Sequence, residues 1–186
     1  IGGAIADADL FLVDDGAGGT LRKTAASRIK TYVTGGITEA DMWRLTASLS
    51  SNADPITSNL ERIDDAGFSK IGTGMSVSSG VWSFPVTGLY EITIIMNTES
   101  GTDDNHIIRQ HTTLNNETSW DAQFNVVIGG DNSYHKHGVS FGFVNVTDVS
   151  NVKIKFEATS IGTGSISGDT NTTYTGFKFI RLGDSQ

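Results

Sequence analysis

The 186-residue chain has a formal charge of −8 at pH 7 and an isoelectric point near 4.8. This acidity argues against a nucleic-acid-binding surface, because affinity for phosphate comes mainly from clustered Lys and Arg. The sequence contains no Cys, which excludes disulfides and thiolate chemistry. No apolar run approaches the roughly 18 residues that a membrane helix needs, so we expect no membrane insertion.

The first 36 residues are predicted to form a small unit of strand, turn and helix. Residues 10–13 are a short apolar run, an acidic, glycine-rich turn follows, and residues 25–33 have the pattern of one short helix. A segment this small cannot bury enough apolar surface to fold alone. We therefore expect residues 1–36 to be a connector or oligomerisation segment that is stabilised by its own copies. Because the chain begins with Ile1 rather than Met, we also expect it to be part of a longer polypeptide.

From Met42 onward the hydrophobic period changes from helical to two, which is typical of strands with one buried face. The clearest alternating runs begin at Trp43, Trp82, Tyr90, Trp120 and Val152. Turn clusters rich in Gly, Asn and Ser separate these runs. About eight to ten strands with no further helix predict that residues 37–186 form an all-β head, an antiparallel jelly-roll sandwich.

Two stretches, residues 141–146 and 177–182, are apolar at both even and odd positions. A strand with two apolar faces needs cover on both, and a two-layer sandwich covers only one. One explanation is a β-bulge that shifts the phase of the alternation. The other is an interface between subunits. On the second explanation the interface residues are Phe177, Phe179, Ile180 and Leu182.

Four segments, in order, resemble the C1q/TNF-like jelly-roll superfamily. They are residues 43–77, GVWSFPVTGLYEITI (80–94), VNVTDVSNVKIKFEA (144–158) and YTGFKFIRL (174–182). The resemblance implies compact trimers in which the first and last strands pack about the threefold axis. It assigns Gly88 and Tyr90 structural roles. No ligand set matches the family's calcium sites, so we predict no metal and no cofactor.

The segment DLFLVDDGAGGTLRKTAASRIKTYV (9–33) is similar to one that is common in tail-fibre and other virion proteins of tailed bacteriophages, where it precedes receptor-binding modules. The two resemblances together imply a homotrimeric virion structural protein, such as a fibre, spike or decoration component. Its partners would be other virion proteins and a glycan or protein of the host surface. The alternative is a C1q-like extracellular binding module or lectin outside viruses.

The polar loops supply the candidate ligand-binding residues. These are Asp131, Tyr134, His135 and His137 in one loop region, and Asp103 and Asn105 in another. Sugar recognition combines an aromatic face with polar side chains that bond hydroxyls, which Tyr134 and its neighbours could provide. Trp120 begins an inward alternation and is interpreted as a core residue.

Metal and catalytic sites are not predicted. His135 and His137 share one strand face at a spacing that permits two metal ligands, but no ordered ligand pattern accompanies them, and we interpret them as polar surface residues. The sequence has neither a nucleophile elbow nor a constrained carboxylate pair. We therefore predict no catalytic residue and no enzymatic activity.

Overall fold

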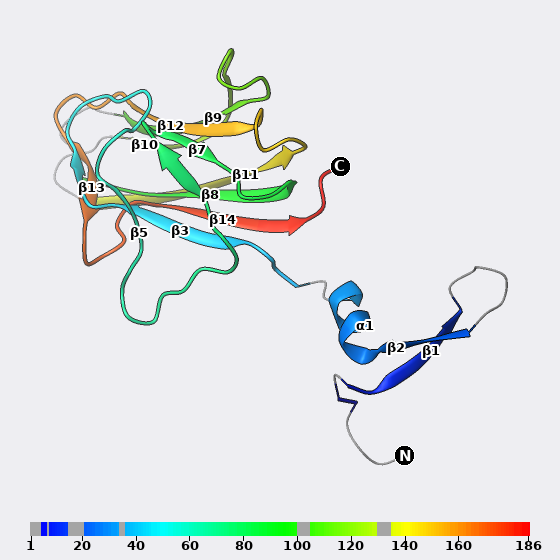
Figure 1. Ribbon diagram of the computed structural model, residues 1–186. Helices are drawn as coiled ribbons and strands as arrows, with labels where there is room; N and C mark the ends of the chain where they lie inside the picture. Colours follow the sequence, from blue (N-terminus) through cyan, green and yellow to red (C-terminus); the bar gives the residue numbers. More distant parts are fainter. Residues whose placement is uncertain (1–4, 7, 15–20, 34–35, 100–104, 130–134) are drawn as a thin grey trace. The chain divides into compact units, whose positions relative to one another are not determined.

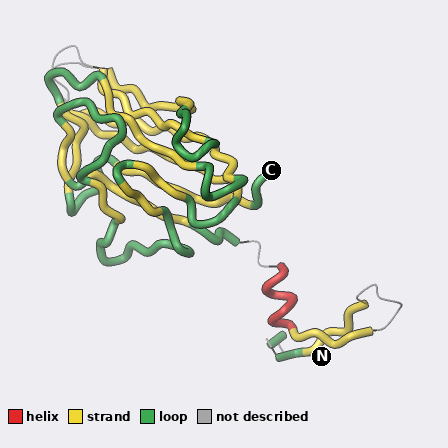
Figure 2. The backbone as a smooth tube through the Cα atoms, turned by 45° about the horizontal axis from the view of Figure 1, so that its top comes forward, coloured by secondary structure: helices red, strands yellow, loops and turns green. Residues whose placement is uncertain are grey.

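The computed structural model divides into two compact units, residues 1–36 and residues 37–186. Both are drawn in Figure 1, and Figure 2 shows their helix and strands by colour. The structure describes residues 5–6, 8–14, 21–33, 36–99, 105–129 and 135–186.

The first unit is a hairpin followed by a helix. Strand β1 (Leu10–Asp14) pairs antiparallel with β2 (Leu21–Ala25), and α1 (Ala26–Val33) follows directly. The helix begins one residue later than predicted because Ala25 still pairs with Leu10 in the hairpin. Leu10, Leu12 and Leu21 are exposed, so this unit presents apolar side chains to its surroundings.

In the second unit, every regular element among the described residues is a strand. They are β3 (Ala40–Leu45), β4 (Ala47–Leu49), β5 (Leu60–Arg62), β6 (Ser76–Ser78), β7 (Val81–Ser83), β8 (Gly88–Glu99), β9 (Asn105–Thr113), β10 (Asp121–Gly129), β11 (His135–Val146), β12 (Lys153–Thr159), β13 (Ser165–Asp169) and β14 (Gly176–Gly183).

These strands form two antiparallel sheets that lie face to face (Figure 1). The five-stranded sheet has the order β10-β9-β12-β7-β6. The seven-stranded sheet has the order β4-β13-β8-β14-β3-β5, and β11 also pairs with β8. This arrangement confirms the predicted all-β, antiparallel sandwich.

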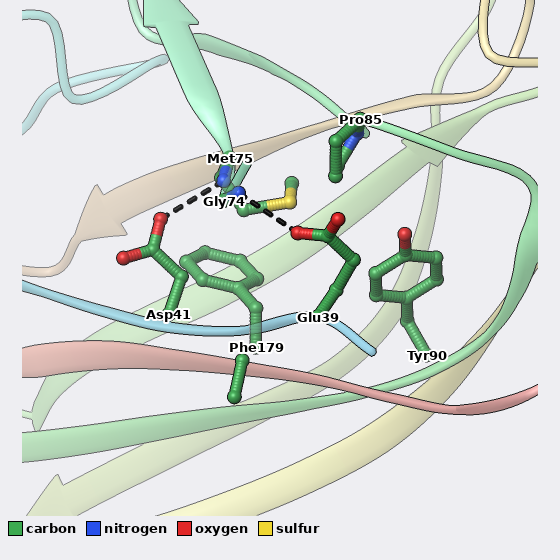
Figure 3. A pocket seen from close by; sticks show the side chains of 8 residues that line it. Glu39, Asp41, Gly74, Met75, Pro85, Tyr90 and Phe179 are labelled. Atoms are coloured by element: carbon green, nitrogen blue, oxygen red, sulfur yellow. Dashed lines mark hydrogen bonds between the residues drawn. The ribbon is translucent and has the colours of Figure 1, made fainter. Parts of the chain in front are cut away.

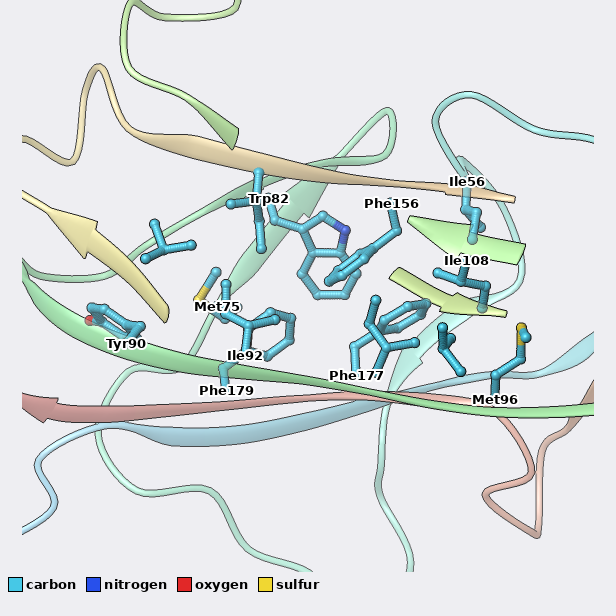
Figure 4. Packing of buried hydrophobic residues seen from close by; sticks show 14 of the residues in the cluster. Ile56, Met75, Trp82, Tyr90, Ile92, Met96, Ile108, Phe156, Phe177 and Phe179 are labelled. Carbon is cyan, nitrogen blue, oxygen red and sulfur yellow. The ribbon is translucent and has the colours of Figure 1, made fainter. Parts of the chain in front are cut away.

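Aromatic rings fill the space between the two sheets (Figure 4). Trp82 of the five-stranded sheet is fully buried and lies 5.2 Å, centroid to centroid, from Phe179 of the seven-stranded sheet. Phe156 stacks on Phe177 in the same layer. Burial of a large apolar side chain contributes about 1.5–3 kcal/mol, so these rings are a main source of stability for the sandwich.

Strand β9 was not predicted, because its buried positions are largely polar. His106, Gln110 and Thr112 point into the sandwich and are buried, along with Ile108. The apolar–polar alternation that reveals a one-sided strand is therefore absent from the sequence. The amide of Gln110 donates hydrogen bonds to the carbonyl of His111 and to Thr112 Oγ1, which compensates part of the cost of burial.

The inward alternation predicted from Trp120 to Ile128 is only half correct. Val126 and Ile128 are buried, but the register with β9 shifts between Ala122 and Phe124. Trp120 precedes this shift and is outside the core cluster. Its ring lies beneath the ammonium group of Lys155, 5.2 Å from Nζ, which is the geometry of a surface cation–π contact.

Candidate functional site

The outer face of the seven-stranded sheet carries an apolar stripe on β11. Val139, Phe141 and Phe143 are 62%, 62% and 56% exposed. They occupy alternate positions, so all three side chains leave the same side of the strand. Three large apolar side chains in one exposed row are uncommon on a monomeric protein and mark an interaction surface.

Both apolar faces of β11 have a physical explanation. The strand pairs with β8 in an unbroken register, from His135 opposite Glu99 to Val146 opposite Gly88. The β-bulge alternative is therefore wrong for this strand. Val144 and Val146 point into the core and are buried, which leaves the odd-numbered side chains on the outer face.

Strand β14 divides its apolar residues in the same way. Phe177 and Phe179 are 0% and 2% exposed, so the core of a single chain already covers them. This corrects their assignment to a subunit interface, because neither side chain reaches the surface. Ile180 is partly buried and Leu182 is exposed, and the interface prediction now concerns these two alone.

An ion pair neutralises one of the acidic side chains beside the apolar stripe. Lys178 of β14 lies opposite Thr93 of β8 on the outer face, and its Nζ is 3.1 Å from Glu91 Oε1. Glu91 lies opposite Phe143 of the stripe, so this ion pair reduces the negative charge that another surface meets at this part of the stripe.

A polar hollow of about 390 Å³ lies on the same sheet, at the end of β11 where His135 stands. Its walls come from β4, β8, β11, β13 and the segment before β14. The lining residues are Ser48, Asn97, Glu99, His135, Ser167, Gly168 and Tyr174. The volume falls in the range of small-molecule sites, about 300–1,000 Å³.

The strand register places the polar side chains of the hollow on one face. Glu99 stands opposite His135 on one side and opposite Ser165 on the other. Residues 97 and 99 alternate with the buried Met96 and Thr98, so they point outward. The sheet thus changes from apolar at Phe143 to polar at His135 along the length of β11.

Hydrogen bonds hold the rim of the hollow in place. Asp169 Oδ1 accepts bonds from the backbone N–H groups of Asn171 and Thr172. Thr175 is fully buried, and its Oγ1 accepts a bond from the N–H of Asn97. These contacts position Tyr174, which lies between them and is 44% exposed.

The predicted ligand-binding residues have different outcomes. Asp103, Asp131 and Tyr134 lie outside the described residues. His135 lines the polar hollow, whereas His137 is exposed on β11 opposite Asn97.

Asn105, the first residue of β9, is exposed and does not line the hollow. Ligand binding by the predicted residues remains a prediction.

Sequence reasoning missed most of the hollow. Ser48, Asn97 and Ser167 come from three strands that are far apart in the chain, and no local motif connects them. Tyr174 carried one usable signal. The turn-rich run DTNTT (169–173) directly precedes it, which indicates that Tyr174 lies next to a surface loop.

A second hollow, shown in Figure 3, has a structural role. Glu39 accepts a hydrogen bond from the N–H of Gly74 at 2.8 Å, and Asp41 accepts one from the N–H of Met75 at 2.9 Å. Arg62 Nε also donates to Asp41. Both carboxylates are buried, and their oxygens already accept hydrogen bonds from residues 73–75 and, for Asp41, from Arg62. They therefore hold residues 73–75 against the start of β3.

Tyr90 lies beside this second hollow and has a perturbed ionisation. Burial of the phenol raises the pKa of Tyr90 to about 12, and the nearby Glu39 carboxylate contributes to the rise. The hydroxyl donates a hydrogen bond to the carbonyl of Val86 at 2.9 Å. The phenol is therefore a protonated structural donor at neutral pH.

Within the described ranges, no three His, Asp or Glu side chains are grouped so that they could hold a metal ion. In the same part of the chain, none of the helices has the length and apolar character to cross a membrane.

Neither the protein-family models nor the curated proteins gave a match to this chain. Several solved structures share its fold. Murine APRIL matches 77% of this chain and 98% of its own length, with a TM-score of 0.58 and 10% identity. The PRD1 vertex protein P5 matches 80% and 100%, with a TM-score of 0.53 and 20% identity.

The globular domain of zebrafish complement 1qA also matches, over 81% of this chain and 100% of its own length, with a TM-score of 0.52 and 12% identity. At these identities the likeness shows the fold alone. The second unit is a jelly roll of the TNF/C1q-like type, as the sequence resemblance implied.

Proposed function

We propose that this chain is a trimeric structural protein of a virion, a fibre, spike or decoration component whose jelly-roll head contacts the host surface. The observation that carries the proposal is the exposed stripe of Val139, Phe141 and Phe143. Covering a side chain of this kind contributes about 1.5–3 kcal/mol. In a structural protein that is built from copies of one chain, association of the copies buries such exposed side chains.

Copies of this chain are the occupants that we assign to the stripe. With a net charge of −8, two copies repel each other over most of their surface, and the Lys178–Glu91 pair lowers that repulsion beside Phe143. The exposed leucines of the β1–β2 hairpin favour association of the first unit as well. The C1q/TNF-like resemblance implies that the number of copies is three.

The virion assignment has two supports. Residues 9–33 are similar to a segment of tailed-phage virion proteins, and one solved structure with this fold is the vertex protein P5 of phage PRD1. The alternative, a C1q-like extracellular module outside viruses, is favoured by the complement 1qA likeness. A collagen-type Gly-x-y stalk upstream of the chain would favour the alternative.

The trimer is tested by light scattering on the full chain and on the double variant Phe141→Ser/Phe143→Ser. The wild type should have three times the monomer mass of 19.8 kDa, and the variant should fall toward one. Val127→Ser is the control, because Val127 is an apolar residue that is 52% exposed on the five-stranded sheet, away from the stripe. A monomeric or dimeric wild type, or a double variant that still associates fully, contradicts the proposal.

The adhesive role is tested by attachment of the labelled wild-type chain to cells of the virus's host. We expect binding to these cells to exceed binding to unrelated bacteria, and an antibody against the head should label intact virions. Equal binding to both kinds of cell would contradict the proposed role in host attachment. Unlabelled virions would remove the virion assignment.

A further inference from the structure

The polar hollow on the seven-stranded sheet offers hydrogen-bonding groups of several kinds in a small space. Glu99 supplies two carboxylate oxygens that only accept, whereas the hydroxyls of Ser48 and Ser167 both donate and accept. His135 provides a ring nitrogen of either character. A ligand that suits this set must itself donate and accept at several neighbouring positions, as the hydroxyl groups of a sugar do.

Asn97, which lines the hollow, keeps one side-chain acceptor unpaired. Within the described part of the chain, Oδ1 of Asn97 is buried and accepts no hydrogen bond. A buried polar atom without a partner costs about 1–3 kcal/mol, so few such atoms persist in a folded protein. Because this atom has almost no accessible surface, a ligand hydroxyl reaches it only after the Asn97 side chain turns toward the hollow.

Tyr174 gives the hollow an apolar wall. Its ring is 44% exposed, and the loop that carries it is tied down by Asp169 and Thr175. An aromatic ring that is fixed in this way can stack on the C–H face of a sugar at little entropic cost. The hollow thus combines a stacking surface with hydroxyl-binding groups.

The charge of the hollow excludes anionic ligands. Glu99 forms no ion pair with any residue in the described part of the chain, and the net charge of −8 adds to the negative potential. A phosphate or an acidic sugar would lose energy on entering. A simple cation would leave the serine hydroxyls and the tyrosine ring without a role.

We propose that this hollow binds one unit of a neutral saccharide. Hydroxyls of the sugar donate to Glu99 and share hydrogen bonds with Ser48, and its C–H face stacks on Tyr174. This inference rests on the proposed host attachment and names the chemical class of the receptor. In a trimer three hollows act together, so a weak single site can still give avidity higher by roughly a hundredfold or more.

The hollow adjoins the apolar stripe without overlapping it. The stripe residues Val139 to Phe143 occupy the middle of β11, and His135 is its first residue. Association through the stripe would therefore leave the hollow beside the interface. A free monosaccharide should bind each hollow even when the stripe is mutated.

The experiment uses the full chain, labelled with ¹⁵N, and follows backbone amide shifts during titration. The probes are methyl β-D-glucopyranoside, methyl β-D-galactopyranoside and N-acetylglucosamine, with N-acetylneuraminic acid as the acidic comparison. At least one neutral probe should shift the amides around Asn97, Glu99, Ser167 and Tyr174 at millimolar concentration. The acidic probe should not shift them.

Two variants test the assigned contacts. Glu99→Gln and Tyr174→Ala should each weaken binding of the responding probe by about tenfold or more, because each removes a charged hydrogen bond or the stacking surface. Glu117→Gln is the matched control, since this glutamate is exposed on the loop after β9, outside the hollow. Its affinity should equal that of the wild type.

The outcomes separate this inference from the proposed function. The saccharide site is refuted if no neutral probe shifts the amide resonances of the hollow, or if both variants bind the probe with the affinity of the wild type. This holds even if the trimer still attaches to host cells. If the Phe141→Ser/Phe143→Ser variant loses cell attachment but binds the free sugar unchanged, the hollow is supported as a site that acts through avidity.

Discussion

Phe156 of β12 stacks on Phe177 of β14, with 4.1 Å between the ring centroids and an interplanar angle of 25°. The first residue belongs to the five-stranded sheet and the second to the seven-stranded sheet. Both rings are buried. This contact joins the two sheets, and it explains why Phe177, close to the C-terminus, belongs to the core.

Phe177→Ala should lower the free energy of unfolding by about 3–5 kcal/mol, because it removes the stacked ring and leaves a cavity between the sheets. The measurement is denaturant unfolding followed by tryptophan fluorescence, which reports on the neighbouring Trp82. Phe141→Ala is the control, since its ring is on the outer face. Its effect on the stability of one chain should be much smaller, and equal losses in the two variants would contradict the assignment of faces.

Arg44 is an almost completely buried cation that is balanced by acidic side chains. Its side chain is 1% exposed, its Nε donates to Glu61 Oε1 at 2.7 Å, and Nη2 is 3.1 Å from Asp64. Arg44→Ala should destabilise the head by about 1.5–3 kcal/mol, because it removes the buried packing of the Arg44 side chain and its charge-assisted hydrogen bonds to Glu61 and Asp64. Thermal unfolding by circular dichroism is the measurement.

The control for this prediction is Arg109→Ala. Arg109 also pairs with a carboxylate, Glu157, but its side chain is 31% exposed, and pairs near the surface contribute about 0–1 kcal/mol. Arg44→Lys keeps the charge but loses the planar fork that reaches several acids at once. A melting temperature for Arg44→Ala that matches the Arg109→Ala value would argue against the network.

Tyr90 should make the head less stable in alkali. Its pKa is about 12 in the folded protein, compared with about 10 in an unfolded chain. Between these values the folded state keeps a proton that the unfolded state has lost, so the free energy of unfolding falls as the pH rises. Below about pH 10 both states are protonated, and this contribution to the pH dependence disappears.

Urea unfolding at about pH 9 and about pH 11 measures this slope. Tyr90→Phe removes the titrating group and should flatten the difference between the two pH values, although loss of the bond to Val86 shifts both values together. Lysines and the other tyrosines titrate in both proteins and therefore cancel. An identical slope in wild type and variant would show that Tyr90 ionises normally.

The sequence predicts the fold well wherever one side of a strand is apolar and the other polar. Strands such as β8 and β12 were readable because Ile92 and Ile154 alternate with polar residues. Strand β9 was hidden because Gln110 and His106 are buried within it. The stripe of β11 was visible as excess apolar character, but only the structure could show that Phe141, rather than Phe177, faces outward.

The polar hollow could be predicted much less completely. His135 was identified, since it stands in a loop-rich, polar region. Ser48 and Ser167 are unremarkable in the sequence and become neighbours only because β4 pairs with β13. The N–H of Gly168 donates to Ser48 Oγ at 3.3 Å. Long-range pairing of this kind carries no local signal, so a site built across five segments appears only in the folded chain.

Gly142 should tolerate no side chain, because β10 packs tightly against β11 at this point. A Cβ atom at Gly142 would collide with the ring of Phe124, which lies against the core from the opposite sheet. The ring packs against the core cluster and would have to shift to make room, so Gly142→Ala should cost about 1–3 kcal/mol in overpacking. Gly183→Ala is the control, because nothing lies within 4 Å of a Cβ there.

Chemical denaturation should show a lower stability for Gly142→Ala than for Gly183→Ala. The double variant Gly142→Ala/Phe124→Leu should regain part of the stability that Gly142→Ala loses. Equal stability of the two single variants, or no recovery in the double variant, would show that the sheets can move apart at this point.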